Sequence, residues 1–254
     1  MNKKVKKNIL KYTFEFFVIV LGISISFWLN KNKIERDNLE KEQQVLTSLI
    51  QNITQIKVSL NKRKVVLDEE NNLMNHLSQN WENLNIDSLV MVLDKGKYIK
   101  SFNNLFLDYR EFHPPTSEIQ TIISDGSIGL IRNKEIKLKI ISTMDKSYES
   151  VTQNVSSEIE LQQFFRELLI TDVSLINSNI LQTTFKELTQ RTWNTHEYRN
   201  KTKKELIAIT QFKPAKNYLN LKLRQRYWVM IFINKFTRDL DDLSKMVSKE
   251  IETI

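Results

Sequence analysis

The 254-residue chain has no cysteine, and it contains only four glycines and three prolines. Without cysteine the chain forms no disulfide, no thiolate metal site, no thiol nucleophile and no lipid-modified N-terminal cysteine. Average usage would give about thirty glycines and prolines together in a chain of this length. Because sheet-rich folds need a turn roughly every ten residues, this scarcity predicts an all-α fold of long helices.

Motifs that carry catalysis or cofactor binding are missing as well. The chain has neither a glycine-rich phosphate loop nor a Gly-x-Ser-x-Gly elbow. Its histidines lie on separate segments, without an acid at helical metal-pair spacing, at His76, His113 and His196. A C-terminal acidic group fans around one helix as a solvated face, at Asp239, Asp241 and Asp242. We therefore expect no catalytic residue, no cofactor and no metal, although a site assembled from scattered residues stays open.

The net charge of +8 is concentrated at the N-terminus. Five of the 38 basic residues precede residue 12, so residues 31–254 hold 33 basic and 29 acidic residues, with Glu15 left out. That near balance indicates an ordinary solvated surface, and no stripe of interleaved basic and aromatic residues appears. We therefore expect no binding of nucleic acid.

One long apolar run follows the basic tail of residues 1–11. The 18 residues from Tyr12 to Leu29 would rise about 27 Å as a helix, which just spans a hydrocarbon core. Aromatic residues gather at both ends, as in the interfacial belts of membrane helices. We predict a transmembrane helix over residues 12–30. A buried helix of a soluble protein and a signal peptide cleaved at Ser24-Ile25-Ser26 are the alternatives.

Basic residues are denser before this run than after it. Five lysines and the amino terminus precede the run, whereas four basic residues follow it over a similar length. The positive-inside rule therefore predicts a cytoplasmic N-terminus and a domain on the opposite side of the membrane.

One face of the predicted membrane helix carries residues spaced by four, three and four, namely Glu15, Ile19, Gly22 and Ser26. Gly22 and Ser26 form a small-x-x-x-small pair that lets another helix approach closely, although small residues are common in membrane helices generally. The Glu15 carboxylate either extends to the interface, or pairs with a partner subunit or lines an ion path. We take these four residues as a candidate packing surface.

Residues 31–78 predict one long helix beyond the membrane, which we call the stalk. Its heptad a positions are all apolar, and they are Leu39, Leu46, Ile53, Leu60, Leu67 and Met74. Half of its d positions are charged, because they hold Glu42, Arg63 and Glu70. Such charges would face their own copies in a parallel coiled coil, so we favour packing within the chain over a homo-oligomeric coil.

The last helix offers an apolar stripe that matches the stalk. Its interface positions are Val229, Ile233, Phe236, Leu240, Leu243 and Val247. An antiparallel pairing in which residue numbers sum to about 293 sets Leu46 against Val247. In that register Glu70 lies near Arg224 or Arg226, whereas Arg63 has no evident acidic partner.

Residues 79–254 are expected to form a helical domain that packs back on the stalk as an antiparallel bundle. A connecting region covers 79–116, and further helices cover 160–192 and 197–210. Gly126 is expected to be left-handed in a tight corner, Asn133 to cap the next helix, and Pro214 to stand in the first turn of the last helix.

Two blocks of sequence carry a resemblance to known proteins. The first is Glu15-Phe-Phe-Val-Ile-Val-Leu-Gly22-Ile-Ser-Ile-Ser26 followed by a charged helix. The second is Pro115-Thr-Ser-Glu-Ile-Gln-Thr-Ile-Ile-Ser-Asp-Gly126-Ser-Ile-Gly-Leu-Ile-Arg-Asn133. Both resemble an uncharacterised family of single-span inner-membrane proteins of Bacteroidota. The resemblance implies a bacterial inner-membrane location and a helical periplasmic domain, but no activity.

These patterns together predict a membrane-anchored periplasmic interaction or scaffold protein without catalytic activity. Its expected partners are the membrane and other envelope proteins, reached through the membrane-helix face and the stalk, and it is a candidate homo-oligomer. The alternative is a subunit of an ion-conducting or signalling membrane complex, including a defence effector, that uses Glu15.

Overall fold

The computed structural model describes residues 3–87, 106, 111–171, 203–204 and 207–254, with side chains from residue 14 onward. These residues form helices and connections without a β-strand, so the described chain is all-α, as the shortage of turn residues predicts. The predicted connection over 79–116 and the predicted helices over 160–192 and 197–210 lie partly outside the described residues, and His196 lies wholly outside them.

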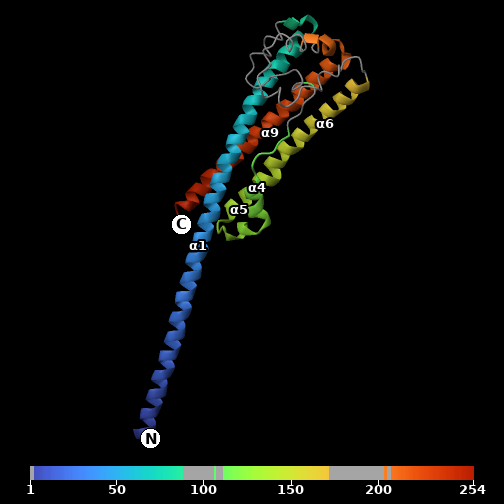
Figure 1. The fold of residues 1–254 in the computed structure, drawn as a ribbon. Coiled ribbons are helices and arrows are strands. Elements are labelled where there is room, and N and C mark those ends of the chain that lie inside the picture. Colours follow the sequence, from blue (N-terminus) through green and yellow to red (C-terminus); the bar gives the residue numbers. More distant parts are fainter. Residues whose placement is uncertain (1–2, 88–105, 107–110, 172–202, 205–206) are drawn as a thin grey trace, which may run out of the picture.

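Helix α1 (Lys3–Asn80) runs without a break through both the predicted membrane segment and the stalk. Its 78 residues rise about 117 Å at 1.5 Å each. Figure 1 shows α1 as a rod, with the other helices gathered along its C-terminal half. Near the N-terminus α1 is long and apolar enough to cross a membrane, and the described chain buries none of that apolar stretch.

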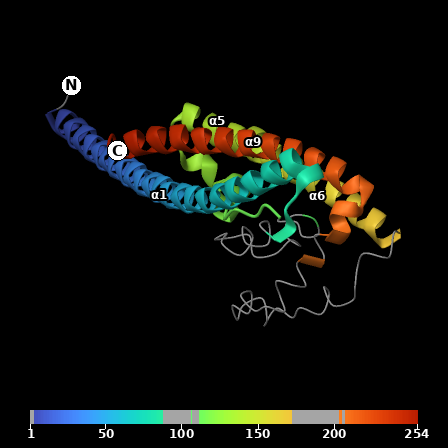
Figure 2. The ribbon, with the colours of Figure 1, turned by 90° about the horizontal axis from the view of Figure 1, so that it is seen from above.

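Helix α9 (Lys213–Ile251) runs antiparallel along α1 (Figures 1 and 2), and Pro214 stands in its first turn as predicted. Helix α6 (Glu149–Thr171) packs on α9 rather than on α1, so α9 lies between the two. The buried positions of α9 recur every three or four residues from Ala215 to Val247, which is the period of a helix that buries one face.

A chain of short elements leads from the connection into α6. They are α4 (Ser117–Ser124), the 3-10 turn η2 (Ser127–Leu130), α5 (Lys134–Ser142) and the π-helical segment η3 (Thr143–Tyr148). Gly126 has a φ of +82° at the corner between α4 and η2, which confirms the left-handed conformation. The side-chain oxygen of Asn133 accepts hydrogen bonds from the backbone N–H groups of Glu135 and Ile136, which confirms the helix cap.

The register between α1 and α9 differs from the predicted one by about one helical turn. Three contacts join the helices: Glu70 with Arg226, Lys57 with Asp241, and Ser78 with Asn220. Their residue numbers sum to 296, 298 and 298, whereas the apolar pattern predicted about 293. An apolar stripe that repeats every turn fits its neighbour nearly equally well one turn away, so the pattern alone does not determine the register.

Candidate functional site

A layer of charged and polar side chains crosses the interior of the bundle and separates two apolar clusters. One cluster includes Leu67 of α1 and Val229 of α9, and the other includes Leu73 of α1 and Leu219 of α9. Between them lie five buried polar side chains: Glu70 of α1, Glu158 and Gln162 of α6, and Lys222 and Arg226 of α9. Because ionisable groups are rarely fully buried unless they are paired, this layer is the most unusual feature of the core.

Arg226 lies at the centre of this charged layer. Its Nη1 forms an ion pair with Oε2 of Glu70, and its Nε donates a hydrogen bond to Oε1 of Glu158 at 2.6 Å. One turn away, Nζ of Lys222 donates to Oε1 of Gln162 at 2.7 Å and lies 5.6 Å from the centre of the Tyr218 ring. A single guanidinium therefore joins three helices, through an ion pair with Glu70 and a charge-assisted hydrogen bond to Glu158.

The charges of the layer hold one another ionised. Burial raises the pKa of Glu158, but attraction by Arg226, Lys222 and Arg63, together with the Arg226 hydrogen bond, outweighs burial and leaves that pKa below its usual value. Burial lowers the pKa of Arg226, and the two carboxylates raise it by more, so the guanidinium stays charged. Burial raises the pKa of the Tyr218 hydroxyl, which therefore stays neutral.

Glu70 and Glu42, two of the three charged d positions of the stalk, form ion pairs with arginines, and the third, Arg63, lowers the pKa of a buried glutamate. Glu70 pairs with Arg226, one of the two arginines proposed for it. Glu42 accepts hydrogen bonds from the backbone N–H and the Nε of Arg132, both at 2.6 Å. The positive charge of Arg63 lowers the pKa of Glu158 on α6. This acid could not be found by comparing the stalk with the last helix alone. The charges that argue against a homo-oligomeric seam thus serve packing within one chain.

The predicted membrane-helix face lies on α1 and outside the bundle. Glu15, Ile19, Gly22 and Ser26 are all exposed, and no heavy atom comes within 4 Å of a Cβ built on Gly22. This face is therefore accessible in the described chain. Its role in packing stays a prediction.

The predicted stalk and C-terminal interfaces meet along α1 and α9. All six C-terminal positions are at most 1% exposed, and they are Val229, Ile233, Phe236, Leu240, Leu243 and Val247. Five of the six stalk positions are likewise at most 1% exposed, and they are Leu46, Ile53, Leu60, Leu67 and Met74. Leu39 is only partly buried. The buried part of α1 begins one turn later, at Glu42, because Arg132 covers that carboxylate.

The C-terminal acidic residues form ion pairs with lysine side chains of the same chain. Asp239 pairs with Lys139 at 2.7 Å and accepts a hydrogen bond from Ser147 of the π segment at 2.5 Å. Asp241 pairs with Lys57 at 2.5 Å. Among the described residues, no group of three or more acidic, histidine or cysteine side chains is placed to hold a metal.

Sequence reasoning missed Glu158, Gln162 and Lys222. Their positions carry a usable signal, because they occupy the same buried repeat as the apolar residues around them. On α9 that repeat runs through Leu219, Lys222, Arg226 and Val229, and on α6 through Val155, Glu158, Gln162 and Phe165. Each buried stripe contains two consecutive polar positions. Those on α9 are cationic and those on α6 are anionic or neutral, which indicates that the two stripes face each other.

Comparison with known proteins finds no match to a family model, a curated protein or a solved structure. The resemblance to the Bacteroidota membrane family therefore stays a prediction.

Proposed function

We propose that this chain is a membrane-anchored helical interaction protein without catalytic activity, whose bundle is held in the periplasm by one N-terminal span. The observation that carries the proposal is the continuity of α1. One unbroken helix contains both the apolar segment and the main wall of the core. A partner bound to either part of this helix would therefore sit at a fixed position relative to the other part.

The charged layer supports a structural role for the interior rather than a reactive one. Arg226 is paired with Glu70 and Glu158, and Glu70 and Arg226 are at most 2% exposed, so substrate has no access to them. Interaction surfaces therefore have to lie on the outside of the bundle and on the exposed face of the span.

Reporter fusions test the topology that this proposal requires. A reporter active only in the periplasm, fused after Ile254, should be active, and the same reporter fused before Met1 should be silent. Purification of the tagged chain in mild detergent should then recover envelope proteins, with the Gly22→Leu variant as the matched test of the span face. A cytoplasmic C-terminus would contradict the proposed location, and a chain that recovers no partner under several detergents would contradict the interaction role.

A second candidate function follows from Glu15. Its carboxylate shares the exposed face of the apolar segment with Gly22 and Ser26, where a partner subunit or an ion path would meet it. In this alternative the chain is a subunit of an ion-conducting or signalling membrane complex, such as a defence effector. Glu15→Gln should then abolish the activity of the complex while its membrane level stays unchanged. Full activity of both Glu15→Gln and Glu15→Ala would eliminate this alternative.

A further inference from the structure

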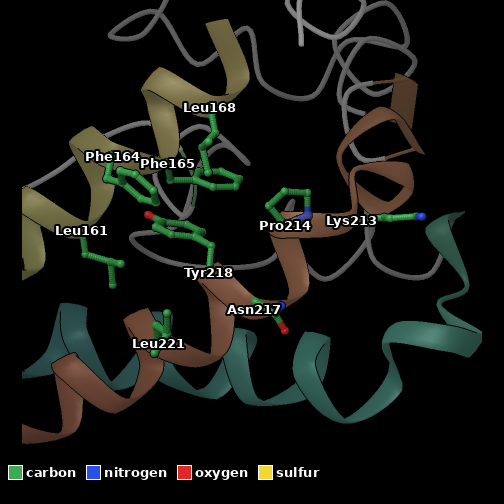
Figure 3. A pocket seen from close by; sticks show the side chains of 9 residues that line it. All are labelled: Leu161, Phe164, Phe165, Leu168, Lys213, Pro214, Asn217, Tyr218 and Leu221. Atoms are coloured by element: carbon green, nitrogen blue, oxygen red, sulfur yellow. The ribbon is translucent and has the colours of Figure 1, made fainter. Parts of the chain in front are cut away.

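An open apolar groove lies between α6 and α9 at the end of the bundle remote from the span. Figure 3 shows its side chains, which come from Leu161, Phe164 and Leu168 on α6 and from Pro214, Tyr218 and Leu221 on α9. The cavity measures about 290 Å³. Phe164 and Leu221 are 59% and 51% exposed, although both are large apolar residues. Clustered exposure of this kind marks binding surfaces more often than isolated exposed residues do.

The two rims of the groove carry opposite charges. On α6, Glu160 and Glu167 lie four residues before and three residues after Phe164, so they share its exposed face. On α9, Arg224 follows Leu221 by three residues, and Lys213 lines the groove at its end. Within the described part of the chain, neither Glu160 nor Arg224 takes part in an ion pair.

Contacts inside the bundle place the two charged rims at one level. The ion pair of Glu158 with Arg226 and the hydrogen bond between Gln162 and Lys222 join residues whose numbers sum to 384. In an antiparallel helix pair, other residues with the same sum lie level with one another. Glu160 and Arg224 satisfy that sum, so they stand at equal height on opposite sides of the groove.

We propose that this groove binds the same groove of a second copy of the chain, in a two-fold dimer whose axis runs parallel to α6 and α9. Rotation about that axis places α6 of one copy opposite α9 of the other. Glu160 of each copy then meets Arg224 of the other at the same level, and the apolar floors face each other. The dimer names a second copy of the chain as one partner in the proposed interaction role, and it rests on that role.

The charge pattern and the anchor together favour a second copy over an unrelated partner. A partner has to place basic groups against the acidic rim on α6 and acidic groups against the basic rim on α9, at the same level along the helices. The groove of a second copy carries this arrangement of charges. The same rotation leaves α1 pointing in one direction in both copies, as two chains anchored in one membrane require. This last argument rests on the proposed membrane anchoring.

Single cysteines test the contact in the full chain, because the protein contains no cysteine of its own. In the proposed dimer Leu221 of one copy lies opposite Phe164 of the other, because their residue numbers sum to 385. A mixture of Leu221→Cys chains and Phe164→Cys chains should therefore give a disulfide-linked heterodimer under mild oxidation in lipid nanodiscs. Val58→Cys mixed with Phe164→Cys is the matched control, since Val58 is also 51% exposed but lies on α1. A chain that stays monomeric, equal crosslinking of both mixtures, or crosslinking of Leu221→Cys only to another protein would overturn the proposal.

Charge exchange tests the register of the dimer. Introduced into both chains of the Leu221→Cys and Phe164→Cys mixture, Glu160→Arg and Arg224→Glu should each lower the crosslinked fraction at least several-fold, and the double variant should restore it. Lys245→Glu, an exposed change elsewhere on α9, should leave it unchanged. Unaltered crosslinking in both single variants would refute the Glu160 to Arg224 contact, and circular dichroism of each variant confirms that the bundle is folded.

The dimer and the proposed function can fail separately. Absence of a groove dimer with a periplasmic C-terminus and recovered envelope partners refutes only the dimer. A groove dimer in a chain with a cytoplasmic C-terminus refutes only the proposed location.

Discussion

Nη1 of Arg226 forms an ion pair with Oε2 of Glu70 between α9 and α1, and both side chains are at most 2% exposed. The same guanidinium reaches Glu158 on α6 at 2.6 Å. Removing such charges from water costs several kcal/mol for each ion, and only close pairing offsets that cost. Apolar packing tolerates small shifts, whereas this contact requires its partners at one height, so it fixes how the three helices align.

Replacing Arg226 should destabilise the bundle severely. Arg226→Met leaves two buried carboxylates without their cation, and we expect a loss of about 3–5 kcal/mol in the free energy of unfolding. Urea unfolding of the full chain in mild detergent, followed by circular dichroism, measures this loss. Arg238→Met changes an exposed arginine on the same helix and should cost less than about 0.5 kcal/mol. Equal losses in the two variants would contradict the role given to the charged layer.

The stability lost in Arg226→Met should be partly recovered by neutralising its partners. Adding Glu70→Gln and Glu158→Gln removes the unpaired buried charges, so the triple variant should be more stable than Arg226→Met alone. A triple variant that is less stable than Arg226→Met would show that the carboxylates interact favourably with other groups.

Acid should weaken the bundle through Glu158. Its folded pKa lies below the unfolded value of 4.5, so its contribution to stability is complete above that pH and is lost as the pH falls through the depressed folded pKa. Glu158→Gln should be less stable at neutral pH, and its stability should fall less steeply between about pH 5 and pH 3. Glu40→Gln, at an exposed site on α1, should keep the wild-type slope. Parallel profiles for wild type and Glu158→Gln would refute this prediction.

Gly126 should be sensitive to substitution for conformational reasons alone. Its φ is +82°, and a Cβ built there meets no atom within 4 Å, so Gly126→Ala adds strain without a clash. We expect a loss of about 1–2 kcal/mol in the free energy of unfolding. Gly129 has equally open surroundings without a left-handed φ, so Gly129→Ala is the control and should not destabilise the chain. Similar melting temperatures for the two variants would count against the strained corner.

Paired cysteines should report the register of α1 against α9. Lys57 and Asp241 form an ion pair at 2.5 Å and are both partly exposed, so Lys57→Cys with Asp241→Cys should crosslink within one chain. Asn234 lies two turns from Asp241 on the same helical face, and Lys57→Cys with Asn234→Cys should not crosslink. Gel mobility after oxidation distinguishes the two pairs, and preferential crosslinking to residue 234 would show that the register is wrong.

The sequence by itself determined the helices and the faces they bury. Scarce glycine and proline excluded a sheet-rich fold, and the local signals at Gly126, Asn133 and Pro214 were each sufficient to predict the conformation found. Apolar spacing identified the buried faces of α1 and α9, because a helix buries residues that recur every three or four positions. All of these are properties of neighbours along the chain.

Tertiary structure alone decided the register, the partners of the buried charges and the groove. Leu39 fits the stalk repeat yet remains partly exposed, because the bundle begins where Arg132 meets Glu42. The charge of Arg63 lowers the pKa of Glu158 only once α6 packs against α9. The physical reason is that apolar burial is non-directional and almost unchanged by a shift of one turn. Hydrogen-bonded charges depend on direction and distance, so they select one arrangement that the apolar pattern leaves open.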